Sequence, residues 1–133
     1  GSEMCIRDRY NDFENYINHR NNTSTTRKED LTHRFYTLMM DNYREHKEVI
    51  FYADKLHVSS KYLSEVVKET SGKSPKDWII DYSLLEIKEL LKNSSLNIQE
   101  ITIRTKFLNQ SALGRFFKRH TNMSPSEYRE STY

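Results

Sequence analysis

The chain has 133 residues, of which 35% are hydrophobic and 30% are charged, and its formal net charge is +2. This length allows one modest domain or two very small ones, and the low apolar content excludes a large core. Three glycines and two prolines are too few for a turn-rich β fold, so the composition favours helices.

The first 30 residues are polar and show little periodicity. Gly1 and Ser2 resemble the remnant of an expression tag, and residues 19–26 have the composition of a linker. Four apolar residues in this stretch could instead form one face of a short helix: Tyr10, Phe13, Tyr16 and Ile17. We interpret residues 1–30 as a tag remnant and a linker from a missing upstream region, and residues 31–133 as the domain.

Two helices are predicted at the start of this domain. From Leu31 the apolar residues recur at helical spacing, which predicts a helix over about 31–46. A short helix over about 49–56 follows, in which Ile50, Ala53 and Leu56 are expected to face inward.

The third predicted helix has clear signals at both ends. Ser59 or Ser60 is expected to be its N-cap, and it runs to about Thr70. Gly72 then ends it, as glycine commonly does at helix C-termini. Its inward residues are Leu63, Val66 and Val67.

A longer helix is predicted over about 75–93. It begins at Ser74-Pro75, because proline is well placed in a first helical turn. Its apolar residues surround much of its surface, so we expect it to be buried between two neighbours.

The second half of the chain repeats this order of signals. A short helix is predicted from Ile98, and Phe107 and Leu108 break it. Asn109 caps a further helix, and Ser124-Pro125 opens a last turn. The inward residues of the capped helix are Leu113, Phe116 and Phe117.

Two segments match at a constant offset of 50 residues: 63–68 with 113–118, and 73–78 with 123–128. Asn122 aligns with Gly72, and both residues tolerate a left-handed backbone. A short helix, a turn, a capped helix and a Ser-Pro step, present twice, predict two helix-turn-helix units. We place them at about 49–75 and about 97–125, joined by the long central helix. The predicted fold is therefore all-α, with about seven helices.

Several motifs of the chain resemble those of a known family. The second unit carries Ile98-x-Glu100-Ile101, Phe107, Gln110-Ser111, Phe116-Phe117-Lys118 and Ser124-Pro125-x-Glu127-Tyr128-Arg129, and the first carries Phe51-Tyr52-Ala53-Asp54-Lys55-Leu56 and Tyr62-Leu63-Ser64. Over about residues 33–129 the chain resembles the C-terminal DNA-binding domain of the AraC/XylS family, in the form common in Bacteroidetes. The resemblance implies a bacterial transcription regulator with two recognition helices in successive major grooves on one side of the DNA. The chain departs from the family pattern at Gly114, where a longer base-reading residue is common.

A recognition helix needs polar groups that reach base edges on the side opposite its core-facing residues. The residues expected to read bases are Lys61, Ser64 and Glu65 in the first unit, and Gln110, Ser111 and Arg115 in the second. Arg115 is the strongest candidate, because a bidentate Arg–guanine pair discriminates by about 1–3 kcal/mol. Two alternatives remain at this stage: Lys61 and Glu65 could form a surface ion pair at i, i+4 spacing, and Gln110 could cap or bridge backbone groups.

Residues near the helix ends are expected to contact phosphate, which gives affinity without sequence preference. These are Ser60, Lys68, Lys73 and Lys76 in the first unit, and Asn109, Lys118, Arg119 and His120 in the second. Residues 97–129 hold six basic and two acidic residues, a net +4, whereas residues 49–79 hold five and four, a net +1. The second unit is therefore the more basic one.

Enzyme chemistry is not indicated. The five histidines show no metal-ligand spacing with acids or with Cys5, and three glycines could hardly form a phosphate-binding loop. We expect no metal and no cofactor. A lone cysteine, no run of about 18 apolar residues and no visible secretory leader favour a cytoplasmic protein without membrane contact.

Double-stranded DNA is the expected partner, and RNA polymerase is a further candidate. The isolated module is expected to be monomeric, and the full-length protein could be dimeric. The alternative is a protein-interaction module that keeps the fold but binds DNA weakly or not at all, which Gly114 and the low net charge motivate.

Overall fold

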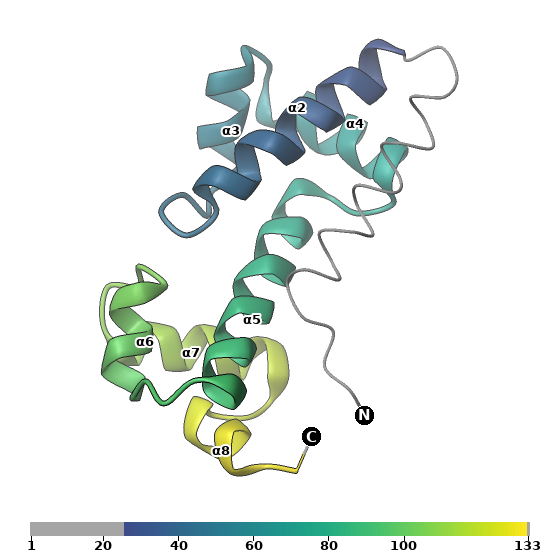
Figure 1. The fold of residues 1–133 in the computed structure, drawn as a ribbon. Helices are drawn as coiled ribbons and strands as arrows, with labels where there is room; N and C mark the ends of the chain where they lie inside the picture. The colour runs from purple at the N-terminus through teal and green to yellow at the C-terminus, as the bar shows by residue number, and fades with distance from the viewer. Residues whose placement is uncertain (1–25, 133) are drawn as a thin grey trace. The chain divides into compact units, whose positions relative to one another are not determined.

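The computed structural model describes residues 26–132, and within that range it contains seven α-helices and no strand (Figure 1). The helices are α2 (Arg27–Asn42), α3 (Val49–Leu56), α4 (Ser60–Ser71), α5 (Pro75–Asn93), α6 (Ile98–Arg104), α7 (Gln110–Thr121) and α8 (Pro125–Glu130). The all-helical prediction is confirmed for this part of the chain. The helix face proposed for residues 10–17 lies outside the described residues.

The chain divides into two compact units, whose boundary falls between Tyr82 and Ser83 within α5. The N-terminal unit, as described, contains α2, α3, α4 and the first part of α5. The C-terminal unit contains the rest of α5 with α6, α7 and α8. Each unit thus holds one predicted helix-turn-helix pair, α3 with α4 and α6 with α7.

Helix α2 begins and ends four residues earlier than predicted. It starts at Arg27 because Thr26 is the N-cap, whose side-chain oxygen accepts a hydrogen bond from the Glu29 amide at 3.1 Å. The composition of residues 19–26 predicts a linker that includes Thr26, and its capping role corrects this prediction. At the other end the helix stops at Asn42, whose side-chain amide donates to the Leu38 carbonyl at 2.8 Å.

The core of the N-terminal unit holds an aromatic residue that the periodicity missed. Ile50 was expected to face inward, but it is 60% exposed, and Tyr52 is fully buried in α3 instead. The Tyr52 ring packs edge-on against Phe35 of α2, and its hydroxyl donates to the His46 carbonyl at 2.7 Å. The large ring can therefore be buried without leaving its polar end unpaired. Burial also raises the pKa of the Tyr52 hydroxyl, which stays protonated.

The ends of α4 follow the predicted signals. Ser59 rather than Ser60 is the N-cap, since its side-chain oxygen accepts from the Tyr62 amide at 3.0 Å. Gly72 ends the helix in the left-handed conformation, with φ of 86°. His57, at the end of α3, also has a left-handed backbone, with φ of 60°, and so turns the chain between α3 and α4.

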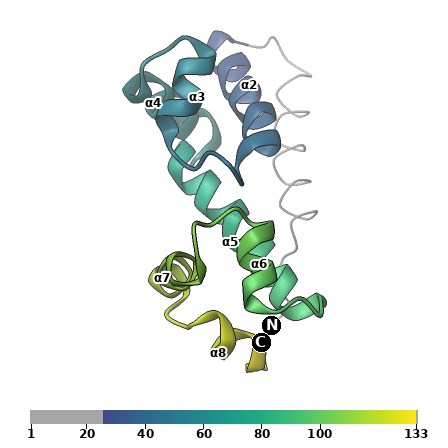
Figure 2. The ribbon, with the colours of Figure 1, turned by 90° about the vertical axis from the view of Figure 1, so that its left-hand side faces the viewer.

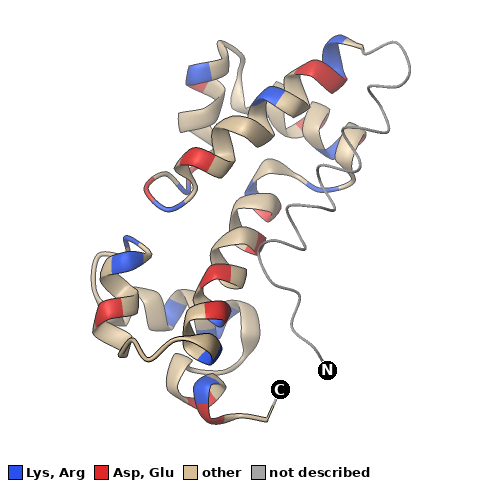
Figure 3. Cartoon of the chain, viewed as in Figure 1, with Lys and Arg blue, Asp and Glu red and all other residues tan. Residues whose placement is uncertain are grey.

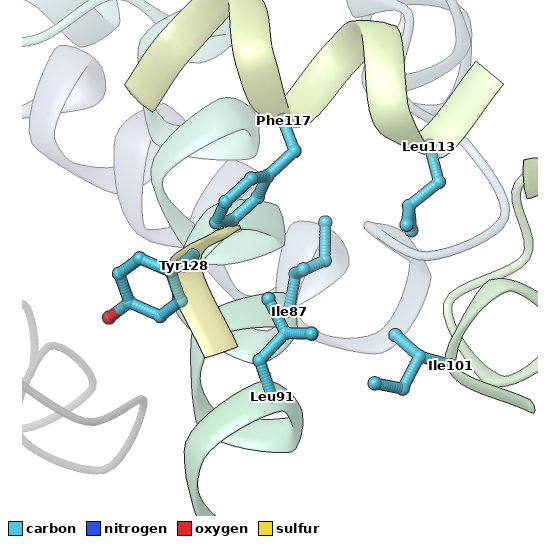
Figure 4. Close-up of a cluster of buried hydrophobic side chains, with 6 residues drawn as sticks. All are labelled: Ile87, Leu91, Ile101, Leu113, Phe117 and Tyr128. Atoms are coloured by element: carbon cyan, nitrogen blue, oxygen red, sulfur yellow. The ribbon is translucent and has the colours of Figure 1, made fainter. Parts of the chain in front are cut away.

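The C-terminal unit is built around one apolar cluster. It consists of Ile87 and Leu91 from α5, Ile101 from α6, Leu113 and Phe117 from α7, and Tyr128 from α8. Figure 4 shows these six side chains pointing toward one another, and Figure 2 shows α6, α7 and α8 grouped along the second half of α5. Phe116, which was also expected to face inward, is only partly buried and packs against this cluster.

Capping side chains define the helix ends of the C-terminal unit. Asn97 and Glu100 form a reciprocal capping box at α6, and Ser124 and Glu127 form another at α8. Hydrogen bonds from Ser124 hold the pKa of the Glu127 carboxyl below its ordinary value of 4.5. Asn122 adopts the predicted left-handed conformation after α7, with φ of 65°.

Arg129 closes the C-terminal end of α5. Its guanidinium donates to the Leu91 carbonyl at 2.9 Å and to the Leu90 carbonyl at 3.3 Å. The last four carbonyls of a helix have no backbone partner within it, so Arg129 supplies a donor to the Leu91 carbonyl and a second donor to the Leu90 carbonyl, which also accepts from the Ser94 hydroxyl at 2.6 Å. Lys92 adds a bond to the Ser131 carbonyl at 2.6 Å, and together the two cations fasten the chain after α8 to α5.

The cluster predicts a large cost for truncating Phe117, which is fully buried and stacks edge-on with Tyr128. We expect Phe117→Ala to lower the free energy of unfolding by about 3–5 kcal/mol, because it removes buried surface and leaves a cavity. Urea denaturation followed by circular dichroism measures this change. Arg119, an exposed residue two positions further along α7, supplies the control. Arg119→Ala should change the free energy of unfolding by no more than about 0.5 kcal/mol.

Candidate nucleic-acid interface

Helix α4 has the two faces that a recognition helix needs. Its core face is formed by Leu63, Val66 and Val67, all of them at most 1% exposed. The residues of the opposite face are Lys61, Glu65 and Lys68, which are exposed, and Ser64, which is half-buried. All three base-reading candidates of the first unit therefore share the outward side of α4 with one phosphate candidate.

The ion pair left open by the sequence does not form. Within residues 26–132, no ion pair joins the Lys61 ammonium to the Glu65 carboxylate, and both residues are exposed. Their charged groups are thus available for an external partner.

Helix α7 shows the same division of faces. Leu113 and Phe117 are fully buried, whereas Ser111 and Arg115 are exposed on the other side. Lys118, Arg119 and His120 are also exposed and occupy the last turn, where cations interact favourably with the helix dipole. The His120 ring packs edge-on against Phe116, with centroids 5.0 Å apart.

Gln110, at the start of α7, already has a side-chain partner. Its amide nitrogen donates to the side-chain oxygen of Gln99 in α6 at 2.7 Å, and both residues are exposed. This bond favours the bridging alternative that the sequence left open, although the partner is a side chain and not the backbone. Reading a base with Gln110 would require this bond to be exchanged or shared.

Gly114 lies in the interior of α7, on the outward side between Ser111 and Arg115. A Cβ atom built at this position would meet no atom within 4 Å. The packing of the unit therefore does not require a glycine here.

Three of the phosphate candidates of the N-terminal unit lie at helix ends. Ser60 is the first residue of α4 and is half-buried, Lys68 lies in its last turn, and Lys76 lies in the first turn of α5. Both lysines are exposed.

Lys73 differs from these because it is already engaged within the unit. Its ammonium pairs with the Asp81 carboxylate and lies 4.7 Å from the centre of the Trp78 ring. A phosphate would have to compete with this carboxylate for the ammonium group.

Asn109 is the N-cap of α7, as the sequence predicted. Its side-chain oxygen accepts from the Ala112 amide at 2.8 Å and so caps α7. The side chain is exposed, and the first-turn amides of α7 lie beside it. An approaching phosphate would meet these amides at the same helix end.

Two exposed apolar side chains border the proposed reading faces and were not predicted. Tyr62, on the flank of α4, is 44% exposed, and Leu108, directly before the N-cap of α7, is 91% exposed. The sequence predicts Leu108 only as part of the break after the helix that begins at Ile98. An apolar residue next to a helix N-cap, without a place in the core periodicity, was the signal that could have identified it.

The two reading faces differ in charge at equivalent positions of the repeat. Glu65 and Glu69 of α4 correspond to Arg115 and Arg119 of α7 at the 50-residue offset. Helix α4 carries both lysines and glutamates, whereas α7 carries two arginines and one lysine, with His120 in addition, and no acidic residue. Figure 3 colours lysines and arginines blue and acidic residues red along the chain. Glu69 is further paired with Lys28 of α2 at 3.1 Å. Attraction for a polyanion is thus concentrated on α7.

Other kinds of site find little support in residues 26–132. There, no group of three or more histidine, cysteine or acidic side chains is arranged to hold a metal ion. No helix in the same range is long and apolar enough to cross a membrane.

Comparison with known proteins gives the family. Residues 52–131 match the family model described as a helix-turn-helix domain. The chain is 32% identical over 77 residues to YobQ, an uncharacterized HTH-type transcriptional regulator of Bacillus subtilis, and 31% identical over 78 residues to the Msm operon regulatory protein of Streptococcus mutans. These alignments cover 58% and 59% of this chain but only 32% and 28% of the two relatives. The chain thus spans about a third of the length of the curated relatives it matches.

Solved structures agree with this assignment. The C-terminal domain of AraT, a response regulator from Geobacillus stearothermophilus, superposes with a TM-score of 0.69 at 25% identity, over 81% of this chain and 93% of that one. The DNA-binding domain of AdpA, solved in complex with a target DNA, has the same fold, with a TM-score of 0.63 at 23% identity over 74% and 88%.

The chain belongs to the AraC-type helix-turn-helix family, as its motifs predicted. YobQ and the Msm operon regulatory protein are transcription regulators, so the domain described here is a DNA-binding domain of the kind found in transcription regulators and not an enzyme.

The cap of α7 gives a prediction about stability. Asn109→Ala should lower the free energy of unfolding by about 1 kcal/mol, because the Ala112 amide loses its acceptor. Asn109→Ser should retain most of the stability, since serine is an equally good N-cap. Thermal denaturation of the three proteins measures the difference, and equal stability of the alanine and native proteins would contradict the capping role.

Proposed function

We propose that this domain binds double-stranded DNA sequence-specifically by inserting α4 and α7 into successive major grooves, and that it thereby regulates bacterial transcription. The observation that carries the proposal is the twofold occurrence of one arrangement. Both helices have a side-chain N-cap, a fully buried apolar stripe and a polar stripe opposite to it. The AdpA DNA-binding domain, of the same fold, was solved in complex with a target DNA, which supports DNA as the partner.

Base reading is assigned to the outward side chains. The Arg115 guanidinium can donate two parallel bonds to the O6 and N7 atoms of guanine, and the Lys61 ammonium can donate to the same acceptors. The Glu65 carboxylate can accept from the amino group of cytosine. The remaining readers are Ser64, Ser111 and Gln110, and Gln110 would act after exchanging its bond to Gln99.

Phosphate contacts would position the two helices without reading sequence. On the C-terminal unit they come from Lys118, Arg119, His120 and the first-turn amides beside Asn109. On the N-terminal unit they come from Lys68, Lys76, the amide of Ser60 and Lys73, which would exchange the Asp81 carboxylate for phosphate. Because α7 has the more basic face, it would supply most of the electrostatic attraction.

We propose that the domain works as part of a longer regulator. The relatives are about three times longer than the matched region, which fits a domain that works within a longer chain. We propose that the isolated domain binds as a monomer, because each of its two units brings its own recognition helix. We propose further that the full-length protein forms a dimer and that it contacts RNA polymerase.

A salt titration of duplex binding tests the DNA-binding proposal against the protein-interaction alternative. The logarithm of the affinity should fall linearly with the logarithm of salt concentration, with a slope of about −0.9 for each phosphate neutralised. Lys118→Gln should make that slope shallower by about one phosphate equivalent. Fluorescence anisotropy with a labelled duplex measures both slopes. No binding to any duplex at low salt would favour the protein-interaction module.

Selection of bound duplexes from a random pool tests the assignment of Arg115. The native domain should recover asymmetric sites, occupied by one chain per duplex. Arg115→Ala should relax the preference at one base position, with a loss of about 1–3 kcal/mol for the preferred site and little change on unrelated sequences. Arg104→Ala, which removes an exposed arginine of α6, is the matched control and should leave the preference unchanged. An unaltered profile for Arg115→Ala would remove this residue from the reading face.

A further inference from the structure

Gly114 is a glycine that the fold does not need. It lies five residues into α7, where the backbone is an ordinary right-handed helix, and a Cβ atom there would have open space around it. Glycine is among the least favourable residues in a helix interior, because it loses the most backbone freedom when the helix forms. Alanine would therefore fit the available space at this position and would stabilise the helix relative to glycine.

The position of Gly114 places it on the side of α7 that would face DNA. Ser111 precedes it by one helical turn, Lys118 follows it by one turn, and Arg115 is its neighbour in sequence. These three flanking side chains are exposed, while Leu113 and Phe117 occupy the buried side. The helix backbone is thus bare at one point, between a short hydroxyl side chain and long cationic ones.

The equivalent position of the first unit does not share this feature. At the 50-residue offset Gly114 corresponds to Ser64 of α4, which carries a side chain. The two reading faces therefore differ in shape at this point as well as in charge.

We propose that Gly114 sets the depth at which α7 enters its groove, by letting the edge of a base pack directly on the helix backbone. This inference rests on the proposed DNA-binding function and assigns a specificity role to a residue without a side chain. Glycine is used where a backbone must approach a ligand closely, and the missing Cβ is the space that the base edge occupies. Arg115 and Lys118 then extend past the contact on the cationic side of the helix.

A base edge fits this position better than a phosphate does. The groups assigned to phosphate lie at the two ends of α7, in its first-turn amides and in Lys118 and Arg119 of its last turn. Gly114 is the fifth of the 12 residues of α7, so it lies in the N-terminal half of the helix, and a recognition helix in the major groove contacts base edges with its N-terminal residues. The contribution of this contact to affinity should therefore depend on the identity of one or two base pairs, and it should differ between DNA sequences.

The test compares fold stability with DNA affinity in Gly114→Ala and Gly114→Ser. Gly114→Ala should raise the thermal midpoint by about 4 °C or more, because alanine favours the helix. The same substitution should weaken binding to the selected duplex by about tenfold, since overpacking a close contact is unfavourable. Gly114→Ser, which introduces the residue found in α4, should weaken binding at least as much.

Thr37→Ala is the matched control. Thr37 is an exposed β-branched residue of α2, outside the proposed reading faces, so its replacement should also favour its helix without changing DNA affinity. If only the Gly114 substitution combines higher stability with weaker DNA binding, the loss of affinity is a property of that position and not of helix stabilisation in general.

The affinities are measured on the selected duplex and on a panel of its single-base variants. Loss concentrated at one or two base positions supports the proposal. Unchanged or tighter binding by Gly114→Ala would overturn it, and so would an equal loss on every sequence, which would move the contact to the sugar–phosphate backbone. A native protein that binds no duplex at all would instead refute the proposed function itself, so the two failures are distinguishable.

Discussion

A helix of 12 residues has little stability of its own in water, and this constraint governs how α4 and α7 are built. Each helix exists because one side of it is buried and its first amides are capped, by Ser59 in one case and by Asn109 in the other. The buried side fixes the rotation of the helix about its axis. That rotation decides which side chains remain outward, so the core residues determine the reading face although they never touch a ligand.

The outward sides of α4 and α7 differ in charge, although both helices are fixed in the same way. Helix α4 balances its lysines with Glu65 and Glu69, and Glu69 is held by Lys28. Helix α7 has only basic charges and is bare at Gly114. A mixed-charge face gains little from phosphates and depends on correct base partners, whereas a basic face attracts any duplex. The internal repeat has thus kept one fold while its two copies have acquired complementary properties.

Much of this architecture could be predicted because it is encoded by local signals. Gly72, Asn109, Asn122 and the Ser-Pro step at residue 124 have strong positional preferences at helix ends, and the structure places each of them as expected. The helical spacing also identified the buried side of α4 correctly, since its apolar residues Leu63, Val66 and Val67 are spaced i, i+3 and i+4 and are flanked by polar residues.

Features that depend on distant partners could not be predicted in this way. Tyr52 is buried because a carbonyl at His46 accepts its hydroxyl, and periodicity alone favoured Ile50. Lys73 meets Asp81 and Gln110 meets Gln99 only once the helices have packed, so both appeared in the sequence as free polar groups. The sequence thus identified which side chains of α4 and α7 face outward but not the bonds that some of them already make.

The clasp formed by Arg129 at the end of α5 determines how short the C-terminal unit can be made. Shortening the chain to Tyr128 would leave the entire apolar cluster in place, yet the Leu91 carbonyl would lose the Arg129 donor and the Leu90 carbonyl would keep only the Ser94 hydroxyl. Residues 129–131 therefore belong to the folding unit itself, and any protein fused behind the domain would need a spacer that keeps these bonds intact.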